Sequence, residues 1–165
     1  MLRLKKFLNE STYRLFSQTL RSDRISLDFS DLTPYEIIRD QYQQWGIQFE
    51  GAIALYPTNP AFITSPNTLI VLPTSHQPVI SVHFHHSKQI AGAVITAAHE
   101  VKLSVFNQDH QLLAEQKAGI PHYLQSYSGA IKPLPQHHLE LIAEHIIKAE
   151  FSSHSPFILH NFFCD

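Results

Sequence analysis

Alternation of apolar and polar residues recurs along most of this chain and is the feature that most restricts its fold. The segment ISLDFSDL (25–32) alternates in this way, and PVISVHFHH (78–86) and VKLSVF (101–106) repeat the pattern. A period of two residues is that of a β-strand with one face buried. Two stretches rich in turn residues, YPTNPAFITSPN (56–67) and NQDH (107–110), separate such segments.

Short strands at near-regular spacing, linked by turns, predict an all-β fold: an antiparallel jelly-roll β-sandwich. NQDH predicts the turn of a β-hairpin between 101–106 and the residues from Leu112 onward. QIAGAVITAA (89–98) is apolar on both faces, as a central strand is. Five residues on the apolar faces of these strands are expected in the core: Phe29, Phe49, Phe84, Leu103 and Phe151.

The segment HLELIAEHIIKAEF (138–151) fits two patterns. Its apolar residues suit one face of a helix, and they equally suit two strands with a change of register at Glu144-His145. The residues of this segment also have favourable helix propensities, so periodicity alone leaves both the helix and the two strands open.

The first 24 residues differ from the rest. They hold six basic and two acidic side chains, a net charge of +4, whereas residues 25–165 hold six basic and twelve acidic side chains, a net charge of −6. Leu4, Phe7, Leu8 and Leu15 fall on one helical stripe. We therefore expect two regions, a basic amphipathic helix with its linker (1–24) and a sandwich domain (25–165).

Composition excludes several classes of protein. Of 165 residues, 44% are hydrophobic and 16% charged, which is typical of a globular domain and not of a disordered chain. Charged residues interrupt the N-terminus, and no apolar run reaches the ~18 residues that a membrane span needs, so a cytoplasmic location is expected. The single cysteine, Cys164, has no internal disulfide partner. An acidic body without interleaved basic and aromatic residues disfavours nucleic acid as a partner.

The chain contains twelve histidines, and three of them fall within HFHH (83–86). If Val82 and Phe84 face the core, His83 and His85 face away from it, and two histidines at i and i+2 on one strand face can share a metal ion. Cupin enzymes use such a pair together with a nearby glutamate. Here the first acidic residue downstream is Glu100, and Lys88 would repel a cation, so a solvated strand face is the favoured interpretation and metal binding the alternative.

The order of several motifs resembles a known family. The relevant features are Phe29, Asp31 and Leu32 near the start, then Gln41-Tyr42, then Gly46, Ile47 and Phe49, followed by VISVHF, the hairpin VKLSVFNQDHQLL and a closing strand FILHNFF. Together they resemble the galactose-binding-like jelly-roll domains of bacterial exosortase-sorted (PEP-CTERM) proteins, over about residues 25–163. The resemblance implies two strands with a short turn at 138–151, against helix propensity.

This resemblance also bears on metal binding. Related carbohydrate-binding jelly rolls often hold a structural Ca²⁺ where the first and last strands meet, which here implies Asp28 and Asp31 as ligands. His160 replaces the family's aspartate in the closing strand, and an imidazole is a poor ligand for Ca²⁺, which disfavours the site in this chain. No other cofactor is expected.

The expected function is a non-catalytic binding or interaction module for a protein partner or a glycan. Tyr56 and Phe62 are candidate stacking platforms, Asn59 a candidate hydrogen-bonding group, and His83 and His85 a candidate ligand surface. One alternative is a metal-dependent, cupin-like enzyme that uses His83 and His85. Another is a structural subunit that attaches to an assembly or to a membrane surface through residues 1–22.

Overall fold

The computed structural model describes residues 24–62, 65, 67–119 and 133–165. Its short strands are β1 (Ile25–Leu27), β2 (Ile37–Ile38), β3 (Ile47–Glu50), β4 (Ala52–Leu55) and β5 (Ile70–Pro73). Its longer strands are β6 (Val79–Ala97), β7 (Val101–Phe106), β8 (Leu112–Ala118), β9 (Gln136–Ser153) and β10 (Phe157–Cys164). Two single turns of 3-10 helix, η2 (Gln43–Trp45) and η3 (Pro60–Phe62), complete the described elements. No helix in these ranges is long and apolar enough to cross a membrane.

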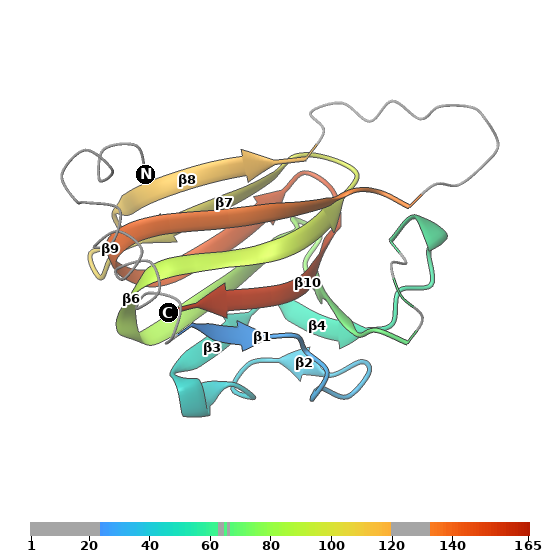
Figure 1. Ribbon diagram of the computed structural model, residues 1–165, viewed down its shortest axis with the longest axis horizontal. Helices are drawn as coiled ribbons and strands as arrows, with labels where there is room; N and C mark the ends of the chain where they lie inside the picture. Colours follow the sequence, from blue (N-terminus) through green and yellow to red (C-terminus); the bar gives the residue numbers. More distant parts are fainter. Residues whose placement is uncertain (1–23, 63–64, 66, 120–132) are drawn as a thin grey trace, which may run out of the picture.

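The strands form an antiparallel β-sandwich, as the sequence predicted. The hydrogen-bonded order is β2-β4-β5-β10-β6-β9-β7-β8, with β1 on β10 and β3 on β6. Figure 1 shows the first strand, β1, beside the last, β10, so that the two ends of the sandwich domain meet. The segment PHYLQSYS (121–128) also predicts a short strand. This segment and the expected N-terminal helix lie outside the described residues.

The long strands β6 and β9 belong to both layers of the sandwich. In the first half of β6, residues 81–84 pair with β3 and residues 79–83 pair with 148–152 of β9. In the second half, residues 91–97 pair with β10 and residues 91–96 pair with 136–141 of β9. Two register shifts separate these halves of β6. The register shifts also change which face of β6 is buried. Val82 and Phe84 are buried in the first half of the strand, and Ala91 and Ala93 are buried in the second. The two strands expected at 78–86 and 89–98 are therefore one continuous strand.

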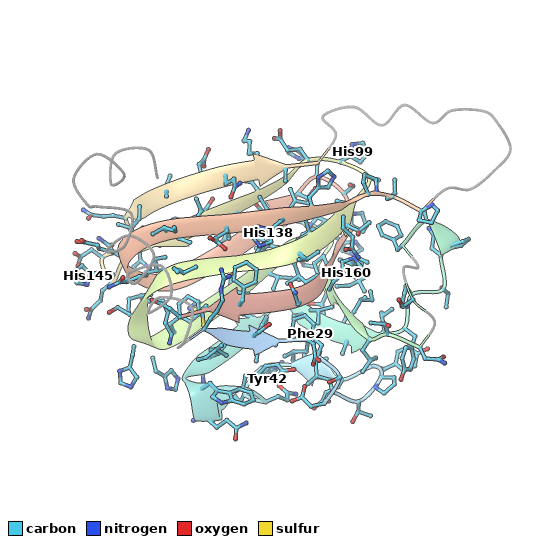
Figure 2. The ribbon with its side chains drawn as sticks, in the orientation of Figure 1. Phe29, Tyr42, His99, His138, His145 and His160 are labelled. Atoms are coloured by element: carbon cyan, nitrogen blue, oxygen red, sulfur yellow. The ribbon has the colours of Figure 1, made fainter. Side chains whose placement is uncertain are left out.

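Residues 138–151 form strand and not helix, which confirms the prediction made from the resemblance. The expected short turn is wrong, however, because β9 runs unbroken from Gln136 to Ser153. His145, at a φ of 63°, marks the irregularity, and Figure 2 shows it at the end of the sandwich where β9 bends. β6 pairs with β9 on both sides of His145, so β9 continues as one strand through the bend.

The core is apolar and rich in aromatic rings. All five expected core residues are buried: Phe29, Phe49, Phe84, Leu103 and Phe151. Phe162 contacts Phe49 at a centroid distance of 5.7 Å and Phe84 at 6.1 Å, which packs the closing strand against the layer that contains β3 and the first half of β6. Cys164 is a free thiol in this core, and its burial raises the pKa to about 11. It behaves there as a small apolar residue.

The predicted hairpin is present. Strands β7 and β8 pair from Val101–Ala118 to Phe106–Leu112. Asn107 forms the turn, because its Oδ1 accepts hydrogen bonds of 3.0 Å from the backbone amides of both Asp109 and Gln111. An asparagine side chain that bonds its own turn in this way is the usual chemistry of such connections.

Candidate functional site

A cleft of about 480 Å³ opens where the chain crosses from one layer of the sandwich to the other. We call it the Arg39 cleft, and it is lined by Ile37, Arg39, Asp40, Gln48, Phe49, Glu50, Gly51, Thr74 and His83. The lining residues come from β2 and the segment after it, from β3 and the glycine after it, from the residue after β5 and from β6. Six of them carry charged or hydrogen-bonding side chains.

Gly51 makes the crossing. It lies between β3, which pairs with β6, and β4, which pairs with β2 and β5. Its φ is 76°, and a Cβ at this position would lie 2.7 Å from the carbonyl oxygen of Val79. Only glycine adopts this conformation at this approach without strain. The carbonyl of Gly51 in turn accepts a 2.9 Å hydrogen bond from the amide of Thr74, which fixes the third wall of the cleft.

Alternation in β3 directs polar side chains into the cleft. Ile47 and Phe49 are buried, so Gln48 and Glu50 point to the opposite side. Gln48 lies directly across from His83 in the pairing of β3 with β6. His83 Nε2 lies 3.3 Å from Oε2 of Glu50, and the side chain of His83 is partly exposed to solvent whereas that of Glu50 is largely exposed.

The segment after β2 supplies the opposing wall. The carbonyl of Arg39 accepts a 2.9 Å hydrogen bond from the amide of Phe49, and its own amide donates 2.7 Å to Oε1 of Gln41. These two bonds hold the backbone on both sides of the Arg39 side chain. Nε2 of Gln48 donates a 2.8 Å hydrogen bond to Oδ1 of Asp40, which joins the two walls.

The arrangement offers a set of hydrogen-bonding groups around one concave space. It contains one guanidinium, two carboxylates, one amide, one hydroxyl and one imidazole. In the described parts of the chain, no group of three or more His, Cys, Asp or Glu side chains lies close enough to hold a metal ion. The groups of the cleft suit recognition of a ligand that carries several hydroxyl or other polar groups.

The predicted facing of the histidine strand is confirmed. Val82 and Phe84 are buried, His85 is exposed, and His83 is partly exposed. The two histidines have different surroundings, because His83 lines the Arg39 cleft and His85 does not. His85 instead packs beside Gly46, whose carbonyl accepts a 2.9 Å hydrogen bond from the His85 amide.

The predicted loop site shows ordinary turn chemistry. Oδ1 of Asn59 accepts a 3.0 Å hydrogen bond from the amide of Ala61, and its carbonyl accepts one of 3.0 Å from the amide of Phe62. Phe62 is half-buried, and Tyr56 is 44% exposed. None of the three lines the Arg39 cleft.

The three residues implied as a calcium site have separate partners. Asp28 Oδ1 accepts hydrogen bonds from the hydroxyl (2.7 Å) and the amide (3.1 Å) of Ser30, which hold the pKa of this carboxyl below its usual value. Asp31 accepts a 2.8 Å bond from the hydroxyl of Tyr42. His160 Nε2 lies 2.8 Å from Oγ1 of Thr96, and partial burial lowers its pKa.

Most residues of the cleft were missed by the sequence analysis. Alternation already indicated that Gln48 and Glu50 face away from the core. Nothing in the sequence indicated that this face meets His83, because pairing of β3 with β6 joins residues more than 30 positions apart. Arg39, Asp40 and Thr74 carry no recognisable motif.

These features define a class by architecture: an antiparallel β-sandwich with a polar cleft between its layers. No family model matches the chain, and no curated protein matches it in sequence. Similar solved structures include the K2 cleaved adhesin domain of Lys-gingipain, at 8% identity and a TM-score of 0.49, with 87% of this chain and 98% of that one covered. A family 29 carbohydrate-binding module from Piromyces equi is 6% identical, with a TM-score of 0.42 and coverage of 72% and 79%.

An arabinose-bound α-L-arabinofuranosidase is also similar, at 11% identity and a TM-score of 0.44, with 84% of this chain but only 25% of that one covered. At such identities and scores, these likenesses say nothing about what the present chain binds. The specific resemblance to domains of exosortase-sorted proteins stays a prediction.

Proposed function

We propose that this protein is a non-catalytic binding module and that the Arg39 cleft binds a carbohydrate. The observation that carries the proposal is the convergence of six hydrogen-bonding side chains from two strands and two adjoining segments on one space of about 480 Å³. A saccharide presents several hydroxyl groups, each of which donates and accepts hydrogen bonds. Asp40, Glu50 and Gln48 supply acceptors for such a ligand, and Arg39 supplies donors.

Preorganisation supports the same proposal. The bond between Gln48 and Asp40, and the backbone bonds on either side of Arg39, fix the polar groups before a ligand arrives. A site that is already ordered loses less conformational entropy on binding than a flexible one. Ile37, 53% exposed at the rim, adds an apolar contact for the C–H face of a sugar ring.

The test is a glycan array, followed by calorimetric titration of the saccharide that binds best. Gln48→Ala removes an amide that lines the cleft and joins its walls, and we expect the affinity to fall roughly tenfold. Gln44→Ala is the matched control, because Gln44 is exposed and does not line the cleft. Binding of no saccharide, or an equal loss in both variants, would contradict the proposal.

Further measurements test two alternatives to a carbohydrate-binding module. A stoichiometric Fe, Mn, Ni or Zn in the purified protein, lost in the double variant His83→Gln with His85→Gln, would favour the metal-dependent enzyme. A protein that co-purifies from the native cell, and is lost in Gln48→Ala, would favour a protein partner for the cleft. Attachment to an assembly through residues 1–22 and a cytoplasmic location are separate proposals, testable by truncation and by cell fractionation. No finding supports a membrane contact.

A further inference from the structure

Tyr35 is the most exposed large hydrophobic residue in the described parts of the chain, with 78% of its surface open to solvent. Its backbone is also in a conformation that is unfavourable for tyrosine. Its φ is 67°, in the left-handed region. Tyr35 follows Pro34 in the turn Thr33–Glu36, which the amide of Glu36 closes with a 3.1 Å hydrogen bond to the carbonyl of Thr33. This is the third position of a type II turn, where glycine or asparagine is the usual residue.

The turn is held firmly against the sheet. The amide of Tyr35 donates a 2.7 Å hydrogen bond to the carbonyl of Ala54, and the amide of Ala54 donates one of 2.9 Å to the carbonyl of Glu36. The carboxylate of Glu36 accepts further bonds from the amide of Thr33 (2.9 Å) and from Nε2 of Gln41 (2.7 Å). The backbone beneath Tyr35 is therefore rigid.

The side chain of Tyr35 takes no part in this bonding. Within the described ranges its hydroxyl has no hydrogen-bond partner and its ring no aromatic partner. A strained and exposed aromatic residue on a rigid turn contributes little to folding, and strain of this kind is concentrated at functional positions. The ring is thus a platform that the fold presents to solvent.

An apolar row lies on the same edge of the sheet. Ile37, Ile53 and Leu72 are directly opposite one another across β2, β4 and β5, and we call them the Ile53 row. They share the outer face of the sheet, because Ile38, Ala52 and Val71 are in the core. Ile37 belongs both to this row and to the lining of the Arg39 cleft, so the two surfaces are continuous.

We infer that Tyr35 and the Ile53 row form a second subsite that takes a further sugar unit of an oligosaccharide bound in the Arg39 cleft. The inference rests on the proposed function. A sugar ring has polar edges and an apolar C–H face, which match a polar cleft and an adjoining apolar platform. An aromatic ring offers large contact area with few rotatable bonds to fix, so stacking on Tyr35 costs little entropy. The natural ligand is accordingly a saccharide chain and not a single sugar.

The test measures affinity against chain length by calorimetry, using the saccharide found on the array as a series from monomer to hexamer. Tyr35→Gly removes the ring and relieves the left-handed backbone, so the variant should be at least as stable as the native protein. We expect its affinity for the longer members to fall about tenfold and its affinity for the monomer to stay unchanged. Tyr35→Phe retains the ring and should bind all members as the native protein does.

Four results would overturn the inference, and the first three leave the proposed function standing. If affinity in the native protein does not rise with chain length, the ligand occupies the cleft alone. If Tyr35→Gly binds long chains as tightly as the native protein, the second subsite is elsewhere; if it loses the monomer equally, Tyr35 supports the cleft and forms no subsite of its own. If no saccharide binds at all, the proposed function fails, and the second subsite fails with it.

Discussion

The hydroxyl of Tyr42, a residue that Figure 2 shows at the base of the sandwich, donates a 2.8 Å hydrogen bond to Oδ1 of Asp31. The ring of Tyr42 is buried among Phe29, Phe49 and Trp45, and only its hydroxyl reaches a polar partner. Burial raises the pKa of this phenol because it removes water from the charged phenolate, and the hydrogen bond to Asp31 raises it further because it favours the protonated form. The bond joins the first loop of the domain to its aromatic core.

Tyr42→Phe should therefore lower the free energy of unfolding by about 1 kcal/mol, since it removes one hydrogen bond to a charged group that is partly accessible to water. Urea denaturation measures this change. Tyr56→Phe is the matched control, because Tyr56 is exposed, and its stability should stay within about 0.5 kcal/mol of the native value. Equal stability of the two variants would show that the Tyr42–Asp31 bond contributes nothing.

Acid should weaken the turn that carries Tyr35. The amide of Thr33 and then the side chain of Gln41 donate hydrogen bonds to the carboxylate of Glu36, and they lower its pKa from the ordinary 4.5. A carboxyl whose pKa is lower in the folded state stabilises the fold above its unfolded pKa, and this contribution disappears as the pH falls through the folded pKa. Between about pH 5 and pH 3 the native protein should lose more stability than Glu36→Gln.

Two measurements check this expectation: thermal melting of both proteins across the range, and an NMR titration of the Glu36 carboxyl. Asp28, whose pKa is also lowered, is present in both proteins, so its effect cancels in the comparison. Parallel pH profiles for the two proteins would contradict the prediction.

Phe84→Ala should cost roughly 3–5 kcal/mol, as expected for loss of a buried phenylalanine. The ring stacks on Phe162 and sits on the face of β6 opposite to His83 and His85. His85→Ala, one position along the strand, should change stability by less than about 0.5 kcal/mol because its side chain is exposed. If the two variants were equally destabilised, the facing of this part of β6 would be wrong.

Removal of residues 1–22 should leave a folded domain. The described chain already ties its start to its end: β1 pairs with β10, and the guanidinium of Arg24 lies 4.0 Å over the ring of Phe163 while bonding to Glu140. The truncated chain retains all these contacts and should melt cooperatively, near the temperature of the full chain. Failure of the truncated protein to fold would mean that residues 1–22 cover part of the core.

Chelation with EDTA should leave the melting temperature unchanged, and added Ca²⁺ should not raise it. Asp28 and Asp31 accept hydrogen bonds from Ser30 and Tyr42, and His160 contacts Thr96, so these three side chains face different partners. Metal analysis of the purified protein provides the second readout. A rise of several degrees with millimolar Ca²⁺ would restore the calcium site that the family resemblance implied.

The local sequence pattern was sufficient to predict features that depend only on neighbouring residues, such as which side chains of a strand face the core. The alternation in VISVHF correctly placed Phe84 inside and His85 outside, because side chains of a strand point alternately to its two faces. The turn at Asn107 was equally predictable, since the asparagine bonds amides only two and four residues away. Neither feature depends on distant parts of the chain.

Residues 138–151 show where such reasoning stops. Their apolar residues fit a helix as well as strands, and only the resemblance favoured strand. In the structure this segment is a strand because β6 lies alongside it and satisfies its backbone hydrogen bonds on both sides of His145. The segment's own sequence gives no information about this distant partner. The same long-range pairing converts an expected turn into a bend.

The sequence by itself determined that this chain forms an antiparallel sandwich, which residues fill its core and how the histidine strand faces. Tertiary structure alone decided that β6 and β9 run through both layers, that Gly51 carries the chain between the layers, and that Arg39, Gln48 and His83 meet in one cleft. The physical reason is that facing follows from the geometry of a single strand. The choice of strand partners instead depends on how the whole chain buries its apolar surface and satisfies its backbone hydrogen bonds at once.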